Sequence, residues 1–152
     1  MHAMTFRSKM GIEYQVELPE PLTGMRSAFI FAYIKSGSTL LNNMITCYCQ
    51  ALGIPTFSLF NSAFDSGVPT HEIMKDANIC FNKEGIIYTG FRHYPSFELD
   101  LKGIKCVLLV RDPRDMLVSL YYSIVKSHVI PKNYEPLRES RQLASQQTID
   151  KF

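Results

Sequence analysis

An apolar run that breaks into a turn of small residues constrains the fold of this chain more than any other stretch. Residues 27–33 form a nearly continuous aliphatic and aromatic run, which is typical of a strand covered on both faces of a parallel sheet. Residues 35–39 (Lys-Ser-Gly-Ser-Thr) follow, and apolar side chains then recur at helical spacing until Gly53 and Pro55 end the predicted helix. Such a strand, turn and helix gather backbone N–H groups and the positive end of the helix dipole at one point. The stretch therefore predicts a site for an anionic group.

The order of the other elements predicts a three-layer α/β fold, with a parallel central sheet and helices on both faces. The patterns indicate strands over 12–18, 27–33, 86–90 and 105–110, helices over 39–52, 70–78 and 113–125, and a helical turn over 98–102. Asp112 and Thr70 are placed to cap two of these helices, and Pro113 occupies a first helical position. Ligands of such folds bind beyond the carboxyl ends of the strands, so we expect the site to include the charged loops that follow three of them.

One globular domain with a sizeable core is the expectation for 152 residues, of which 46% are hydrophobic. Within it we distinguish an N-terminal arm with an edge strand over 1–26, a core over 27–126 and a polar C-terminal segment over 127–152. The last segment has few apolar residues to bury. We interpret it as part of an incomplete domain.

Composition and motif spacing exclude several classes of function. A net charge of +2 without a basic stripe argues against a nucleic-acid partner. The longest apolar run, Ala28–Ile34, is too short to cross a bilayer, so no membrane partner is predicted. All four cysteines lie in apolar segments and the chain starts without a secretory signal pattern, which predicts reduced thiols and a cytoplasmic location. His71 and Glu72 lack the second histidine of a zinc motif, so we predict no metal site.

Three motifs resemble those of one family. The turn is not a Walker A loop, because Lys35 precedes the small residues. Residues 33–39 are instead similar to the loop by which sulfotransferases hold the 5′-phosphosulfate of 3′-phosphoadenosine 5′-phosphosulfate (PAPS). Arg111 and Ser119 resemble the family's 3′-phosphate signature, an arginine at a strand end and a serine eight positions later. Residues 93–95 (His-Tyr-Pro) match in kind and order the loop that carries the family's catalytic base.

The resemblance implies a PAPS-dependent sulfotransferase with a P-loop NTPase-like fold, which needs no metal. It would transfer the sulfuryl group to a hydroxyl or amine of a small acceptor, with Lys35 stabilising the leaving phosphate. Arg111 would hold the 3′-phosphate as a planar fork, and Ser119 would donate one more hydrogen bond to it. His93 would take the proton of the acceptor. The 5′-phosphate would be bound by backbone amides and hydroxyls of four residues: Ser36, Gly37, Ser38 and Thr39.

Several alternatives stay open at this point. Phe57, Phe60 and Phe64 are either core residues or the wall of a site for an apolar or aromatic acceptor. Leu40 stands where many family members have a tryptophan that stacks on adenine, and no glycine after Gly103 supplies the family's C-terminal 3′-phosphate segment. The chain is then a fragment, a natural truncation, or half of a site completed by another subunit of a homo-oligomer. The alternative function is an inactive module that binds PAPS or 3′-phosphoadenosine 5′-phosphate (PAP) without turnover.

Overall fold

The fold is described from a computed structural model, which covers residues 2–95, 97–127 and 135–151. The chain divides into two compact units, residues 1–110 and 111–152, and each is described here by itself. The division into 1–26, 27–126 and 127–152 rests on sequence alone and stays a prediction.

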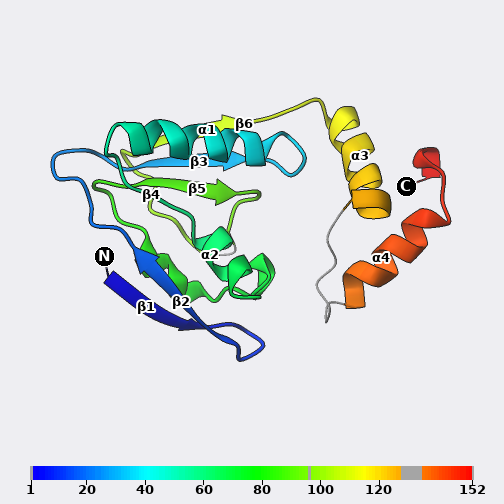
Figure 1. The fold of residues 1–152 in the computed structure, drawn as a ribbon, viewed down its shortest axis with the longest axis horizontal. Coiled ribbons are helices and arrows are strands. Elements are labelled where there is room, and N and C mark those ends of the chain that lie inside the picture. Colours follow the sequence, from blue (N-terminus) through cyan, green and yellow to red (C-terminus); the bar gives the residue numbers. More distant parts are fainter. Residues whose placement is uncertain (1, 96, 128–134, 152) are drawn as a thin grey trace. The chain divides into compact units, whose positions relative to one another are not determined.

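A parallel four-stranded sheet is the centre of the first unit (Figure 1). Its strands are β3 (Ala28–Ala32), β4 (Thr56–Phe57), β5 (Ile87–Phe91) and β6 (Lys105–Leu109), in the spatial order β4-β5-β3-β6. All three strand pairs are parallel. The predicted α/β class with a parallel central sheet is therefore confirmed, and the apolar run forms an inner strand as expected.

Helices and a hairpin cover the two faces of this sheet. Helix α1 (Ser38–Ala51) runs along one face, and helix α2 (Leu59–Asp65) lies on the other face together with the β1–β2 hairpin (Figure 1). Strands β1 (His2–Arg7) and β2 (Glu13–Leu18) pair antiparallel with each other and form a separate two-stranded sheet. The strand expected over 12–18 is thus confirmed as β2. Its partner β1 was not predicted, because only one side chain of β1 is buried and its apolar alternation is therefore weak.

The hydrophobic core lies between the sheet and the layer formed by the hairpin and α2. Aromatic rings dominate it. Phe29 of β3 is 2% exposed, and its ring centroid lies 4.7 Å from that of Tyr88 and 5.7 Å from those of Phe81 and Phe91. Aromatic pairs at such distances add about 1 kcal/mol each to the free energy gained by burying their area. Packing of this kind is what fixes β3 and β5 against each other.

Two predicted helical segments take other conformations, and burial gives the reason. The helix expected over 70–78 is two 3-10 helices, η1 (Thr70–Glu72) and η2 (Lys75–Cys80), because Ile73 between them is extended and only 1% exposed. Thr70 does not cap a helix, since Pro69 is the cap residue and no side-chain oxygen bonds there.

The helical turn expected over 98–102 is also wrong, because this stretch is irregular up to a turn at its end. Its side chains alternate between the core and solvent. Phe97 is buried, Leu99 and Leu101 are half-buried, and the residues between them, Glu98 and Asp100, are exposed. The N–H of Leu101 donates to the carbonyl of Leu99 at 3.0 Å, so a tight turn of three residues replaces the predicted helical turn.

The second unit is helical. It contains α3 (Pro113–Tyr122), a π-helical segment η3 (Ser123–Ser127), α4 (Glu135–Ser145) and a 3-10 helix η4 (Ile149–Lys151). The prediction for the start of α3 is confirmed, because Asp112 accepts a hydrogen bond from the N–H of Arg114 at 2.9 Å and Pro113 is the first helical residue.

Two long-range hydrogen bonds join the helices of this unit. The hydroxyl of Tyr121 donates to the carbonyl of Gln147 at 2.9 Å, and Nε of Arg141 donates to the carbonyl of Ile124 at 2.6 Å. The buried face expected for α3 is found only in part. Leu120, Tyr121, Ile124 and Val125 are half-buried, whereas Leu117 is 59% exposed.

All four cysteines are free thiols, as the sequence predicts: Cys47, Cys49, Cys80 and Cys106. Burial raises the pKa of the Cys80 thiol to about 12. No helix among the described residues combines the length and the apolar character needed to cross a membrane.

We expect the two buried tyrosines to respond differently to loss of their hydroxyl groups. Tyr14 is 2% exposed and its hydroxyl has no hydrogen-bond partner among the described residues, whereas the Tyr88 hydroxyl accepts from the N–H of Asn82 and donates to the carbonyl of Cys80. Tyr14→Phe should change the free energy of unfolding at pH 7 by less than about 1 kcal/mol, and Tyr88→Phe should lower it by about 1–3 kcal/mol. Urea unfolding followed by circular dichroism measures both.

The same variant tests a pH dependence. Burial raises the pKa of Tyr14 from 10.0 to about 12, so the folded state favours the neutral phenol. This contribution is complete below pH 10 and is lost as the pH rises towards 12. Tyr14→Phe should therefore lose stability less steeply than the wild type above pH 10, and an identical slope in both proteins would contradict this account.

Candidate functional site

The turn between β3 and α1 has a strained backbone at the lysine of the predicted phosphate loop. Lys35 has φ +60°, in the left-handed region that L residues rarely adopt, and Gly37 has φ +103°. The carbonyl of Tyr33 accepts hydrogen bonds from the N–H of Ser36 at 3.1 Å and from its hydroxyl at 2.5 Å. Tyr33 also donates its N–H to the carbonyl of Leu109 at 3.2 Å, which joins the ends of β3 and β6. These hydrogen bonds hold the loop in a strained backbone conformation, and such strain is common at ligand-binding sites.

Helix α1 begins directly after this loop, and no side chain caps it. Gly37 is the N-cap residue, and the first turn contains no acidic residue. A Cβ atom at Gly37 would meet only Leu109 Cδ2 at 3.9 Å, so the space beside the loop is open. Lys35 is half-buried and forms no ion pair within the described part of the chain. Free amide groups and an unpaired ammonium group at a helix N-terminus favour binding of an anion.

A β-bulge lies near the carboxyl end of the neighbouring strand β5. The pairing register shifts between Phe29 and Phe31 of β3, so that β5 carries one extra residue before Phe91. Gly90 lies at this extra position with φ +85°, and its N–H donates to Oδ1 of Asn42 on α1 at 3.4 Å. A bulge bends its strand and redirects the chain that follows. Here the redirected chain is the loop that contains the predicted catalytic base.

His93 lies in that loop, beside a cavity of about 180 Å³. Its imidazole is exposed, and the ring centroid lies 5.8 Å from that of Phe60. Aromatic and basic side chains share the wall, which contains no carboxylate. The cavity is lined by Lys9, Phe60, Thr70, His71, His93, Tyr94, Pro95 and Phe97. Such a wall suits a small neutral or anionic molecule with an aromatic ring.

The structure resolves the alternatives for the three phenylalanines of residues 57–64 in different ways. Phe57 is a core residue, and Phe64 is 62% exposed. Phe60 belongs to the core and also lines the cavity beside His93, and whether an acceptor binds there stays a prediction.

The predicted 3′-phosphate residues lie in the second unit, Arg111 two residues before α3 and Ser119 within it. Nε and Nη2 of Arg111 are each 3.4 Å from Oδ2 of Asp115. Asp115 and Ser119 are four residues apart on the same helix and therefore share one face. Any phosphate that binds Arg111 would have to compete with the Asp115 carboxylate.

Arg114 is occupied by a different carboxylate. Its Nη2 and Nε atoms bond Oδ2 and Oδ1 of Asp112 at 2.7 and 3.1 Å. Hydrogen bonding to the Arg114 side chain is the main cause that lowers the pKa of Asp112. Asp112 is thus the cap that the sequence predicts, and Arg114 is an exposed charge beside it.

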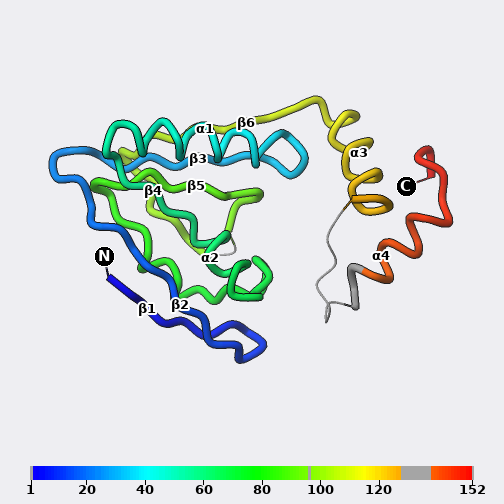
Figure 2. The backbone as a smooth tube through the Cα atoms, viewed as in Figure 1, coloured from blue at the N-terminus to red at the C-terminus, as the bar shows by residue number. Residues whose placement is uncertain are grey.

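The predicted residues therefore form two groups. The loop at Lys35 and the loop at His93 follow the parallel neighbours β3 and β5, and both leave the same edge of the sheet (Figure 2). Arg111 and Ser119 form the second group, within the helical unit.

Sequence reasoning missed the bulge and two cavity residues, Lys9 and His71. A glycine inside an apolar strand pattern, at Gly90, was a signal for the bulge. Lys9 comes from the turn of the unpredicted hairpin. Its N–H donates to the carbonyl of Glu72 at 2.9 Å, a contact across more than sixty residues that no local pattern encodes.

We expect Gly90 to be essential for the conformation of the carboxyl end of β5. A Cβ atom there would lie 2.0 Å from Oγ of Ser58, which accepts the capping hydrogen bond at the start of α2. Gly90→Ala should lower the free energy of unfolding by about 3 kcal/mol, from backbone strain and steric overlap together. The matched control is Gly53→Ala, because Gly53 has φ +66° with no atom within 4 Å of its Cβ position, and strain alone should cost about 1 kcal/mol. Equal losses in urea unfolding of both variants would contradict the steric argument.

No protein-family model, no curated protein and no solved structure matches this chain.

Proposed function

We propose that this chain is a PAPS-dependent sulfotransferase, or the cofactor-binding core of one, which transfers a sulfuryl group to a hydroxyl or amine of a small acceptor. One observation carries the proposal. An uncapped helix N-terminus with an unpaired lysine and a loop with an exposed histidine leave the same edge of a parallel sheet. Ligands of open α/β sheets bind at this edge.

The loop after β3 is suited to the 5′-phosphate of PAPS. The first amide groups of α1 point along the helix axis towards the loop, and Gly37 leaves space for a phosphate to approach the backbone. Lys35 supplies a compact positive charge beside these amides. Stabilising the charge that develops on the leaving oxygen is the main requirement of sulfuryl transfer, as it is for phosphoryl transfer.

His93 is suited to act as the general base. Its imidazole is exposed at the wall of the 180 Å³ cavity, where an acceptor hydroxyl can reach it. In the proposed reaction the acceptor oxygen forms a bond to sulfur, the bond between sulfur and the bridging oxygen breaks, and the acceptor proton moves to His93. The aromatic rings that line the cavity favour an apolar or aromatic acceptor.

Arg111 and Ser119 are proposed to bind the 3′-phosphate. The support comes from the second unit alone, where Arg111 and Ser119 flank Asp115 along α3. A guanidinium group that is half exposed and held by a weak ion pair remains available to a phosphate, which offers shorter and stronger hydrogen bonds.

Titration calorimetry with PAP, combined with sulfate transfer to a panel of phenols and alcohols, tests the proposal. Lys35→Ala and Arg111→Ala should each weaken PAP binding at least about tenfold. His93→Gln should leave PAP binding unchanged and abolish transfer. Lys75→Ala and Lys151→Ala are matched controls, one exposed lysine in each unit, and should change neither PAP binding nor sulfate transfer. Absence of PAP binding to the wild type at millimolar concentration would overturn the proposal, and binding without any transfer would support the inactive module instead.

A second test uses the carboxylate that pairs with Arg111. Asp115→Asn removes the competitor of the 3′-phosphate and one negative charge, so PAP should bind about threefold more tightly. Asp150→Asn makes the same change at an exposed position of the same unit and should leave the affinity unchanged. Equal affinities of Asp115→Asn and the wild type would show that Arg111 does not contact a phosphate of PAP.

A further inference from the structure

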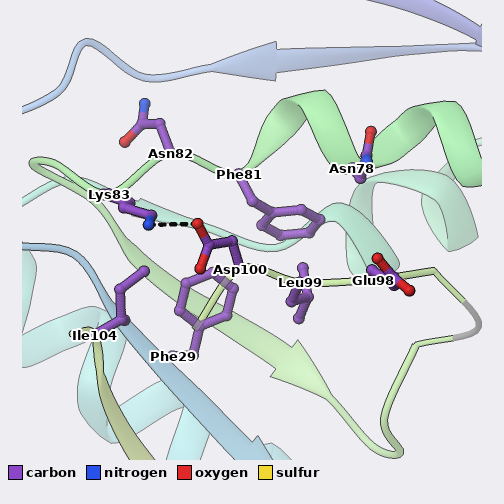
Figure 3. A pocket seen from close by; sticks show the side chains of 9 residues that line it. All are labelled: Phe29, Asn78, Phe81, Asn82, Lys83, Glu98, Leu99, Asp100 and Ile104. Atoms are coloured by element: carbon purple, nitrogen blue, oxygen red, sulfur yellow. Dashed lines mark ion pairs between the residues drawn. The ribbon is translucent and has the colours of Figure 1, made fainter. Parts of the chain in front are cut away.

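A second cavity of the first unit, with a volume of about 530 Å³, is not used by the proposed reaction (Figure 3). Phe29 is the second residue of β3, and Ile104 directly precedes β6. Both therefore mark the amino ends of the parallel strands. The cavity extends from there along the sheet to Glu98, which lies towards the carboxyl end of β5 (Figure 3) and directly follows Phe97, a lining residue of the cavity beside His93. The volume lies within the range of pockets that bind small molecules, about 300–1,000 Å³.

Apolar side chains form the inner part of this cavity. The rings of Phe29 and Phe81 have centroids 5.7 Å apart and are tilted by 42°. Leu99 and Ile104 are half-buried and complete the apolar part (Figure 3). Phe29 is only 2% exposed and Phe81 is half-buried, so a third aromatic ring would contact mainly Phe81, with Phe29 beneath it.

Polar side chains form the rim, and their charges do not cancel. Lys83 and Asp100 form an ion pair across it (Figure 3). Asp100 also accepts a hydrogen bond from the N–H of Lys102 at 3.1 Å. Glu98 lines the same cavity, and its carboxylate forms no ion pair or hydrogen bond with the described residues. The rim therefore has one uncompensated negative charge above an apolar floor.

Neutral hydrogen-bonding groups lie at the rim as well. Asn78 and Asn82 both line the cavity, and Oδ1 of Asn82 is already used by the N–H of Glu84 at 3.0 Å. Its amide NH₂ group and the whole amide of Asn78 remain for a ligand. An anionic ligand would meet the charge of Glu98, whereas a ligand with an ammonium group would neutralise it.

We infer that this cavity binds a small arylalkylamine, with the ring against Phe29 and Phe81 and the protonated amine at Glu98. The ring would replace water on the apolar floor, and the amine would form a charge-assisted hydrogen bond with the one unpaired carboxylate of the described lining. This site does not depend on the proposed sulfuryl transfer, because it shares no lining residue with the cavity beside His93.

Three probes of equal size separate the contributions of ring and charge: 2-phenylethylamine, 2-phenylethanol and phenylacetate. Titration of the full chain, followed by ¹H–¹⁵N correlation spectra at pH 7, should give binding of the amine about tenfold tighter than that of the alcohol. Phenylacetate should bind more weakly than the alcohol. The shifted amide signals should belong to residues 78–83 and 98–104.

The variant Glu98→Gln should lower the affinity for the amine to that for the alcohol and leave the affinity for the alcohol unchanged. Glu17→Gln, the same substitution at an exposed position of β2, is the matched control and should change neither. Glu98 is exposed, and the correlation spectrum without ligand shows whether the variant keeps its fold. Equal affinities of the wild type for the amine and the alcohol, no effect of Glu98→Gln, or amide shifts confined to other residues would each overturn the inference.

Discussion

The parallel pairing of β3 with both β5 and β6 is the constraint on which the rest of the first unit depends. Parallel neighbouring strands must all begin at one end of a sheet and finish at the opposite end. The chain therefore delivers the loop at Lys35 and the loop at His93 to one edge, and the segments that precede β5 and β6 to the opposite edge. The two candidate cavities have different lining residues, and each has its own set of charges.

The aromatic core fixes the register of that strand pairing. Phe29 packs against rings from β5 and from the segment before it, so a slip of one residue in the register would turn its side chain away from the core. The bulge at Gly90 then changes the register once, and Phe91 directly after it still packs in the core against Phe29. The consequence is local: the strand keeps its packing, and only the loop after it is redirected.

Charge is distributed differently around the two candidate sites. At the carboxyl end Lys35 is unpaired, and the cavity beside His93 has basic but no acidic lining residues. In the 530 Å³ cavity the only lysine of the described lining, Lys83, is neutralised by Asp100, and Glu98 remains unpaired. The loop at Lys35 thus favours an anion, whereas the 530 Å³ cavity favours a cation.

The sequence by itself determined the elements whose signals are local. The apolar run of β3, the small-residue loop, the helix that follows it and the cap at Asp112 were all predictable, because sterics, capping and helical periodicity act over a few residues. Tertiary structure decided the pairing of β1 with β2, the register shift before Phe91 and the irregular segment that contains Glu98. In each of these, contacts between residues far apart in the chain outweigh a weak local preference, because burying an aromatic or aliphatic side chain gains about 2 kcal/mol and a typical helix propensity difference is below about 1 kcal/mol.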